Sequence, residues 1–105
     1  MALEVVMSMN AVATYKSICQ SLADYDVDAA LALDKAIYEK LDQLAELPYL
    51  GAIYEEKGEP SPFREVQVGK YRLFYEVKEN RRRINIVLLW HSSRDEPTLY
   101  DLRGR

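Results

Sequence analysis

The chain has 105 residues, of which 49% are hydrophobic and 30% are charged. This length and balance fit one soluble globular domain spanning residues 1–105, with a single modest core. No run approaches the roughly 18 apolar residues that a membrane span requires, and the N-terminus, with an early Glu4 and no basic stretch, does not resemble a secretory signal. The one cysteine, Cys19, cannot form an internal disulfide, so we expect a reduced, cytoplasmic setting.

The net charge of −3 is divided unevenly along the chain. Residues 1–60 hold eleven acidic and four basic side chains, whereas residues 61–105 hold six acidic and ten basic ones. Such asymmetry is compatible with an anionic partner for the basic half, or simply with a domain that has an acidic helical side. The overall acidity argues against sequence-independent nucleic-acid binding, which needs a dense cationic surface.

The first half of the chain predicts a strand followed by two helices. Residues 2–8 are short, apolar and partly β-branched, which predicts a strand, and Asn10 is expected to cap the helix that follows. After a break at residues 23–28, Asp26 or Asp28 can cap a second helix. Apolar residues recur at helical spacing in both helices: Tyr15, Ile18, Cys19 and Leu22 in the first, and Leu33, Ile37, Leu41 and Leu44 in the second. Two helices joined this tightly should form an antiparallel hairpin.

The second half predicts a sheet. Residues 49–62 are rich in Gly, Pro and polar side chains and predict a loop. Strand-like segments follow at residues 63–68, 70–77 and 83–90, separated by short polar turns. The tail, residues 92–105, is expected to add a short edge strand or to stay flexible. Together the elements predict an α+β fold: an N-terminal strand, a helical hairpin and a three-stranded antiparallel meander, with the helices on one face of the sheet.

Alternation along the last two strands predicts which side chains share a face. In the first of them, Tyr71, Leu73, Tyr75 and Val77 oppose Arg72, Phe74 and Glu76; in the second, Ile84, Ile86, Leu88 and Trp90 oppose Asn85, Val87, Leu89 and His91. We expect the tyrosine face to pack on the helices. The face with Arg72 and Phe74 is too apolar to be simply solvated and too charged for a second core, so we expect an open docking surface.

Arg72 lies near the middle of an apolar strand, where an unpaired guanidinium would be costly. Either a carboxylate from Glu65, Glu76 or a helix neutralises it, or its face is kept open for an anionic partner. The residues alone leave both interpretations standing.

The other candidate residues also have structural interpretations. Arg64, near a strand start, is expected to be a solvated charge. His91 is the single histidine and could act as an acid or base near neutral pH, but a hydrogen-bonded structural role is favoured. Arg94 is expected to form a local salt-bridge turn with Asp95 and Glu96. One histidine and one cysteine cannot supply a metal site, and no Gly-rich phosphate loop is present, so neither a metal nor a cofactor is predicted.

The segment VGKYRLFYEV, followed by INIVLLWHSSRDEP, resembles the RelE/ParE superfamily of toxins from type II toxin–antitoxin systems. The residues that carry the resemblance are Gly69, Tyr71, Arg72, Tyr75, Val77, His91 and Arg94. The resemblance covers nearly the whole chain and implies a growth-arresting toxin that is neutralised by a cognate antitoxin. It also implies that the antitoxin or the target is contacted through Arg64, Arg72, Phe74, His91 and Arg94.

Members of this superfamily differ in their targets. RelE-like members are ribosome-dependent mRNA interferases, whose 2′-hydroxyl attack needs a base and cations, whereas ParE-like members inhibit DNA gyrase. The RelE pattern is met by Arg72 and, less closely, Arg64, but Ser92 and Thr98 stand where an arginine and a tyrosine are expected. Of the lysine-rich stretch before the meander only Lys57 is present. These departures, with the acidic net charge, favour ParE-like gyrase inhibition.

Two alternatives stay open. A RelE-like endoribonuclease would act on mRNA at the ribosome through Arg72, Arg64, His91 and Arg94 as catalytic residues. A non-toxic binding module of the same fold would hold only the antitoxin-like partner. Neither a membrane nor a metal enters any of these hypotheses.

Overall fold

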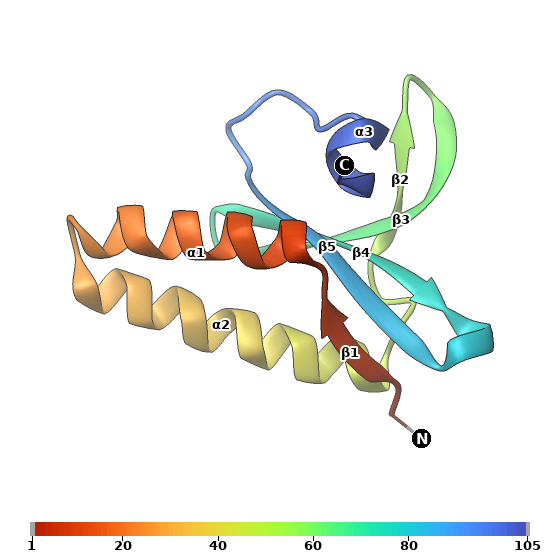
Figure 1. The fold of residues 1–105 in the computed structure, drawn as a ribbon, viewed down its shortest axis with the longest axis horizontal. Coiled ribbons are helices and arrows are strands. Elements are labelled where there is room, and N and C mark those ends of the chain that lie inside the picture. Colours follow the sequence, from red (N-terminus) through yellow and green to blue (C-terminus); the bar gives the residue numbers. More distant parts are fainter. Residues whose placement is uncertain (1, 105) are drawn as a thin grey trace.

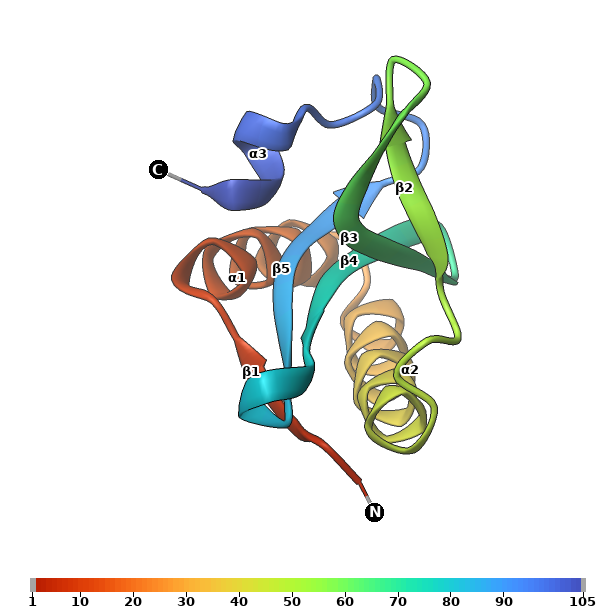
Figure 2. The ribbon, with the colours of Figure 1, turned by 90° about the vertical axis from the view of Figure 1, so that its right-hand side faces the viewer.

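A twisted five-stranded sheet is flanked by helices on both faces in the computed structural model, which describes residues 2–104 (Figures 1 and 2). The elements follow in the order β1 (Glu4–Met7), α1 (Met9–Ala23), α2 (Val27–Glu46), β2 (Ala52–Glu56), β3 (Glu59–Val68), β4 (Tyr71–Lys78), the 3-10 turn η1 (Glu79–Arg81), β5 (Arg83–His91) and α3 (Leu99–Arg103). The strand order is β1-β5-β4-β3-β2, with β1 parallel to β5 and the other pairs antiparallel. The predicted α+β class, N-terminal strand and helical hairpin are confirmed. No helix within residues 2–104 is long and apolar enough to cross a membrane.

The helix starts follow capping chemistry. Ser8, not Asn10, caps α1, and its Oγ accepts a hydrogen bond from the Ala11 amide at 3.0 Å. The expectation for Asn10 was therefore wrong: it lies inside the first turn, and its Nδ2 donates to the Val87 carbonyl instead. Asp26 caps α2 as predicted, with Oδ1 accepting from the Ala29 amide at 3.1 Å.

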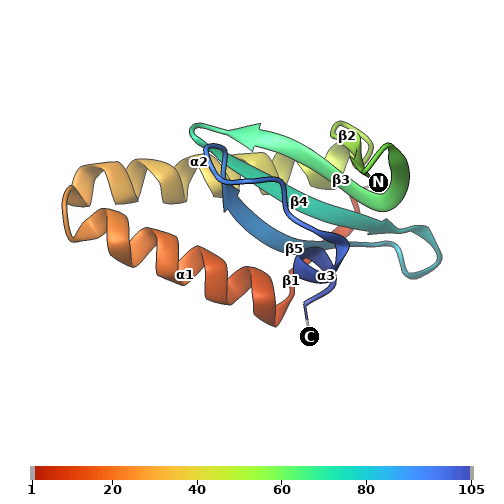
Figure 3. The ribbon, with the colours of Figure 1, turned by 90° about the horizontal axis from the view of Figure 1, so that it is seen from above.

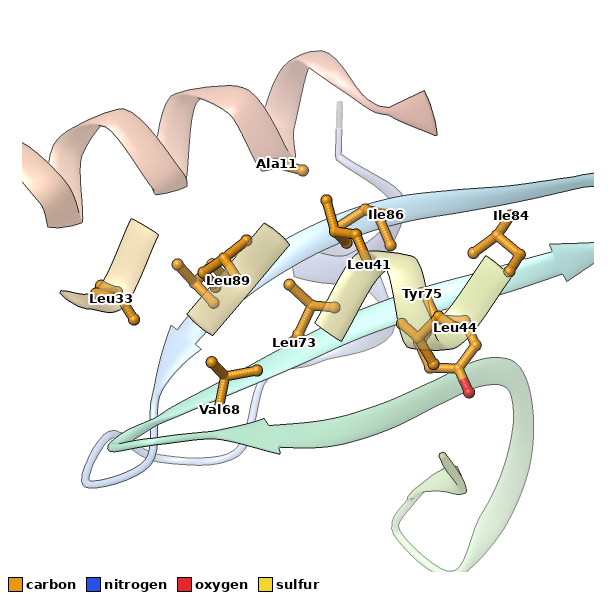
Figure 4. Packing of buried hydrophobic residues seen from close by; sticks show 11 residues of the cluster. Ala11, Leu33, Leu41, Leu44, Val68, Leu73, Tyr75, Ile84, Ile86 and Leu89 are labelled. Carbon is orange, nitrogen blue, oxygen red and sulfur yellow. The ribbon is translucent and has the colours of Figure 1, made fainter. Parts of the chain in front are cut away.

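The helical hairpin packs on one face of the sheet and encloses the larger core. The predicted stripe on α2 is buried, and so is the tyrosine side of β4, which confirms that this face meets the helices (Figure 4). The core consists of Ala11, Leu33, Ile37, Leu41, Leu44, Val68, Leu73, Tyr75, Ile84, Ile86 and Leu89. Each fully buried aliphatic side chain contributes about 1.5–3 kcal/mol relative to an exposed one, so this layer contributes substantially to the stability of the fold.

A β-bulge in β5 changes the faces that simple alternation predicts. Phe74 of β4 pairs with Leu88, but the next residue, Tyr75, pairs with Ile86, so Val87 is an extra residue in β5. Beyond the bulge, Leu88 shares a cluster with Phe74, whereas Leu89 joins the helical core. The predicted faces of β5 were therefore wrong after Val87, because one inserted residue exchanges the two sides of a strand.

The segment predicted as a loop, residues 49–62, contains β2 and the start of β3. β2 pairs antiparallel with β3 and ends the sheet on that side, so the antiparallel meander has four strands rather than three. The turn between them uses Lys57 and Gly58, both with positive φ, which suits a tight hairpin. Tyr54 of β2 is 3% exposed and lies on the face away from the helical hairpin.

The tail forms neither an edge strand nor a loose end within the described residues. It folds back and ends in α3, whose start is fixed by a capping box between Thr98 and Asp101. Leu102 of α3 is 1% exposed and packs in a second cluster that also contains Tyr54, Phe63, Phe74, Val87, Leu88 and Trp90. The expectation of an open face carrying Phe74 was wrong, because the bulge, β2 and α3 together make that face a second core.

Candidate functional site

Arg72, the second residue of β4, lies opposite Trp90 of β5 and Gln67 of β3. Its side chain is 13% exposed and is held by two carboxylates. Nε donates to Glu65 Oε1 at 2.8 Å, and the two terminal nitrogens form a bidentate pair with Glu96. Arg72 is therefore neutralised inside the chain, by one carboxylate that the sequence suggested and by Glu96, which it did not. Glu76, the other candidate, pairs with Lys78 at 3.1 Å instead.

Aromatic rings complete the surroundings of this guanidinium. Arg72 Cζ lies 5.1 Å from the ring centre of Phe74 and 5.9 Å from that of Tyr54, within the range of cation–π attraction. Hydrogen bonding to Glu96 raises the pKa of Arg72 above its ordinary value and outweighs the lowering by burial. Burial also raises the pKa of the Tyr54 phenol. The Arg72 guanidinium is therefore a permanent cation whose charge is already balanced by Glu65 and Glu96.

We call residues 92–104 the C-terminal strap, since this segment crosses the sheet before it enters α3 (Figure 3). Besides the Arg72–Glu96 pair, the hydrogen bonds that hold it include Tyr54 Oη to the Pro97 carbonyl, the Leu99 amide to Glu56 Oε2, Trp90 Nε1 to the Asp95 carbonyl, and Asn10 Nδ2 to the Asp101 carbonyl. The anchors come from β2, β5 and α1, three elements far apart in the sequence. The strap is therefore fixed by tertiary contacts, which explains why its sequence alone resembled a flexible tail.

Arg94 lies over the indole of Trp90, with Cζ 3.7 Å from the ring centre. The expected local salt bridges of Arg94 with its two acidic neighbours were wrong, because Glu96 turns toward Arg72. Arg94 is exposed while its stem covers an aromatic ring, so its charge is presented to solvent in a fixed place.

Arg64 lies in β3 opposite Tyr75 and therefore on the helical side of the sheet. It is not simply solvated: Nη1 donates to the Gly51 carbonyl at 2.7 Å, and Cζ lies 5.0 Å from the ring centre of Tyr49. The Tyr75 hydroxyl accepts from the Gly51 amide at 2.8 Å in the same region. Arg64 thus braces the connection between α2 and β2.

His91 ends β5 and faces the helices. Its ring meets that of Tyr71 edge-on, with 5.1 Å between ring centres. Nδ1 accepts a hydrogen bond from the Ser93 amide at 3.1 Å, so in the neutral ring the proton resides on Nε2. This geometry supports the structural role in a turn that the sequence favoured.

The five predicted site residues do not meet in one place. Arg72, Phe74 and Arg94 lie with the second core and the strap, whereas Arg64 and His91 lie on the helical side of the sheet. Phe74 is completely buried and cannot touch a partner while α3 is docked. The residues that sequence reasoning missed are Glu96 and Tyr54, which reach Arg72 from the strap and from β2. The apolar Ile-Tyr pair at residues 53–54 was the one sequence signal for β2.

Residues 2–104 contain no group of three or more His, Cys, Asp or Glu side chains placed to hold a metal.

Comparison with known proteins decides the family. The family model of the ParE toxin of the type II toxin–antitoxin system parDE matches residues 5–96, nearly the whole chain. The chain is a member of the ParE toxin family. It is thus a toxin of type II toxin–antitoxin systems within the wider RelE/ParE group, as the motif in β4 and β5 predicted. No curated protein matches it by sequence.

Several solved structures share the fold of this chain. The chromosomal ParDE system of P. aeruginosa aligns with a TM-score of 0.68 at 16% identity, over 86% of this chain and 96% of that one. The archaeal RelE–RelB complex of Pyrococcus horikoshii aligns with a TM-score of 0.62 at 22% identity, over 90% and 100%. The isolated E. coli RelE toxin gives 0.61 at 16% identity, over 90% and 89%. At these identities the likeness concerns the fold, which ParE and RelE proteins share.

Proposed function

We propose that this ParE-family toxin arrests growth by binding and inhibiting DNA gyrase in the cytoplasm, and that a cognate antitoxin neutralises it. The observation that carries the choice of target is the dispersal of the four candidate catalytic side chains. Cleavage of mRNA by 2′-hydroxyl attack needs a base and cations around one phosphate. Here Arg72 is bound to two carboxylates, while Arg64 and His91 face the other side of the sheet.

The proposed inhibition is a protein–protein contact without covalent chemistry. Arg94, held over Trp90, and the outer surface of the strap offer a rigid, partly cationic contact on the sheet face away from the helical hairpin. Arg72, which binds Glu96, and Phe74, which packs in the second core, then contribute indirectly by keeping the strap in place. Arg64 and His91 present their exposed edges on the opposite side, where an antitoxin that wraps the toxin can reach them.

The test is inducible expression of the chain, with and without the protein encoded by the adjoining reading frame. Purified chain is assayed in parallel for inhibition of gyrase supercoiling, and RNA from induced cells is examined for cleavage at ribosomes. Growth arrest, lost supercoiling and intact transcripts support the proposal. Cleaved transcripts with normal supercoiling overturn it in favour of the mRNA interferase, and harmless expression overturns it in favour of a non-toxic binding module.

A further inference from the structure

The outer side of β2 is an open strand edge. β2 ends the described sheet opposite β1, and β3 is the one described strand that pairs with it (Figure 2). The Tyr54 carbonyl accepts a hydrogen bond from Ser61 Oγ of β3 at 2.6 Å, so Tyr54 turns its backbone toward β3. Amide and carbonyl groups alternate between the two sides of a strand, so Ile53 and Glu55 turn theirs outward. Pro60, which has no amide to donate, stands opposite Glu55 and agrees with this assignment.

A patch of exposed apolar side chains adjoins this edge. Four large residues within one short stretch are 45–53% exposed, namely Leu47, Tyr49, Leu50 and Ile53. The first of them ends α2, the next two lie in the connection to β2, and Ile53 belongs to β2 itself. Single exposed apolar residues are ordinary on protein surfaces, whereas a group of them beside an unpaired strand edge is typical of an interaction surface.

The charges at this edge are complementary to those of a second, oppositely directed copy. Ile53 stands opposite Arg64 of β3, on the helical side of the sheet. Glu55 follows two residues later in β2 and therefore points to the same side. Neither Arg64 nor Glu55 forms an ion pair within residues 2–104. The edge thus has a cation beside its first half and a carboxylate on its second half, which an antiparallel copy would bring together.

Antiparallel pairing of two copies about Tyr54 uses all of the outward backbone groups at once. Ile53 then stands opposite the partner's Glu55, and each such pair exchanges two hydrogen bonds. The partner's Glu55 lies about 10 Å from the backbone of Arg64, which is two strand spacings, and two long side chains can span that gap. Glu55 faces an isoleucine in this register and not its own copy, so its charge does not oppose the pairing.

We infer that this chain forms a symmetric homodimer in which β2 pairs with β2 of a second copy and joins the two sheets into one. The apolar patch of each copy borders the new pairing, and two Arg64–Glu55 contacts fix its register. The two-fold axis of such a pair is perpendicular to the sheet, so both C-terminal straps lie on one face and both helical hairpins on the other. The dimer rests on the edge, the patch and the charges, and it does not depend on gyrase as the target.

Analytical ultracentrifugation of the purified wild-type chain tests the association. We expect the mass to rise from that of a monomer to that of a dimer as the concentration increases. Amide hydrogen exchange of the same samples should show the Ile53 and Glu55 amides protected about tenfold more strongly in the dimer. A chain that stays monomeric at its highest soluble concentration would overturn the inference. Open-ended assemblies would also overturn it, because symmetric pairing through one edge closes at two copies.

Two substitutions at one position test the charge complementarity. Ile53→Glu should raise the Kd of the dimer about tenfold or more, because it places a carboxylate opposite the partner's Glu55. Ile53→Lys removes the same apolar group but offers that carboxylate a cation, so its dimer should be about tenfold tighter than that of Ile53→Glu. Val6→Glu is the matched control, since Val6 is an exposed β-branched residue on the opposite edge strand. Equal Kd values for Ile53→Glu and Ile53→Lys would overturn the proposed pairing.

Disulfide cross-linking tests the register. In a chain that carries Cys19→Ser, the variants Ile53→Cys and Glu55→Cys are prepared separately and then mixed under oxidising conditions. The two new cysteines face each other in the proposed register, with Cα atoms about 5.5 Å apart, which a disulfide can bridge. Two copies of the same variant meet only diagonally, at about 7–8 Å or more, so each variant alone should cross-link far less. Equal cross-linking of the mixture and of the separate variants would overturn this register.

Discussion

Glu96 of the C-terminal strap binds both terminal nitrogens of Arg72, 24 residues earlier in the chain. Because Arg72 belongs to β4, the central strand of the sheet order, this pair ties the strap to the middle of the sheet. The face that the sequence suggested as an open surface is closed by the chain itself.

Glu96→Gln should loosen the strap without unfolding the protein. The Glu96 carboxylate is 65% exposed, so the lost pair should cost less than about 1 kcal/mol of global stability. Local opening of the strap should increase about fivefold, which amide exchange at Leu102 would detect because that amide donates to Thr98. Asp95→Asn is the control, and equal exchange in both variants would contradict the role of the pair.

Arg72→Met should lower the free energy of unfolding by about 1–3 kcal/mol. The methionine can still cover Phe74, but Glu65, whose side chain is 25% exposed, loses its hydrogen-bonded cation. Urea unfolding measures the effect. Adding Glu65→Gln to the same chain should recover part of the loss, because the uncompensated charge is then removed; a double variant less stable than the single one would argue against this account.

Leu102→Ala should cost about 2–4 kcal/mol, the range for truncating a fully buried leucine. A smaller loss of stability would mean that α3 detaches in the variant and that the remaining residues of the second core repack. Tryptophan fluorescence follows the change, because Trp90 belongs to the same cluster. Arg103→Ala, at an exposed position of α3, should leave both stability and fluorescence unchanged.

Gly51→Ala should destabilise the protein by about 1–3 kcal/mol through overpacking. An added Cβ would lie 2.6 Å from the Glu65 carbonyl oxygen and 2.7 Å from the Tyr75 hydroxyl. Neither can yield easily, since one is backbone in β3 and the other belongs to a fully buried ring. Thermal unfolding of Gly51→Ala should be compared with that of Ala52→Ser at the exposed neighbouring position; equal midpoints would show that the loop relaxes.

Stability should fall in alkaline solution because the Tyr75 phenol ionises more readily in the unfolded chain than in the folded one. Burial raises the pKa of Tyr75 above the ordinary 10.0, so the neutral form is favoured by the folded state. The contribution is fully present below pH 10.0 and is lost as the pH rises from there through the folded pKa, because the unfolded chain loses its proton first. Urea unfolding across this window should show a steeper decline for the wild type than for Tyr75→Phe, and parallel profiles would contradict the assignment.

The limits of sequence-based prediction are visible in particular residues. The stripe from Leu33 to Leu44 and the tyrosine side of β4 were predictable, because helical and strand periods report burial directly. The exchange of Leu88 and Leu89 between faces was not, since the extra residue Val87 matches its neighbours in hydrophobicity. Of the two partners of Arg72, only Glu65 was predictable, because it lies on the adjacent strand. Glu96 belongs to the strap, and no local sequence pattern predicts where the strap lies in the fold.

The amino-acid sequence by itself determined the order of the main elements, the helical hairpin, the side of β4 that is buried on it and the membership in a toxin family, because each depends on local periodicity or on a motif of adjacent strands. Tertiary structure decided what the other face does. The bulge at Val87, the pairing of β2 with β3 and the docking of Leu102 all depend on contacts between segments distant in sequence. Those contacts bury Phe74 and neutralise Arg72, because they bring β2 and the strap over the face that local patterns leave open.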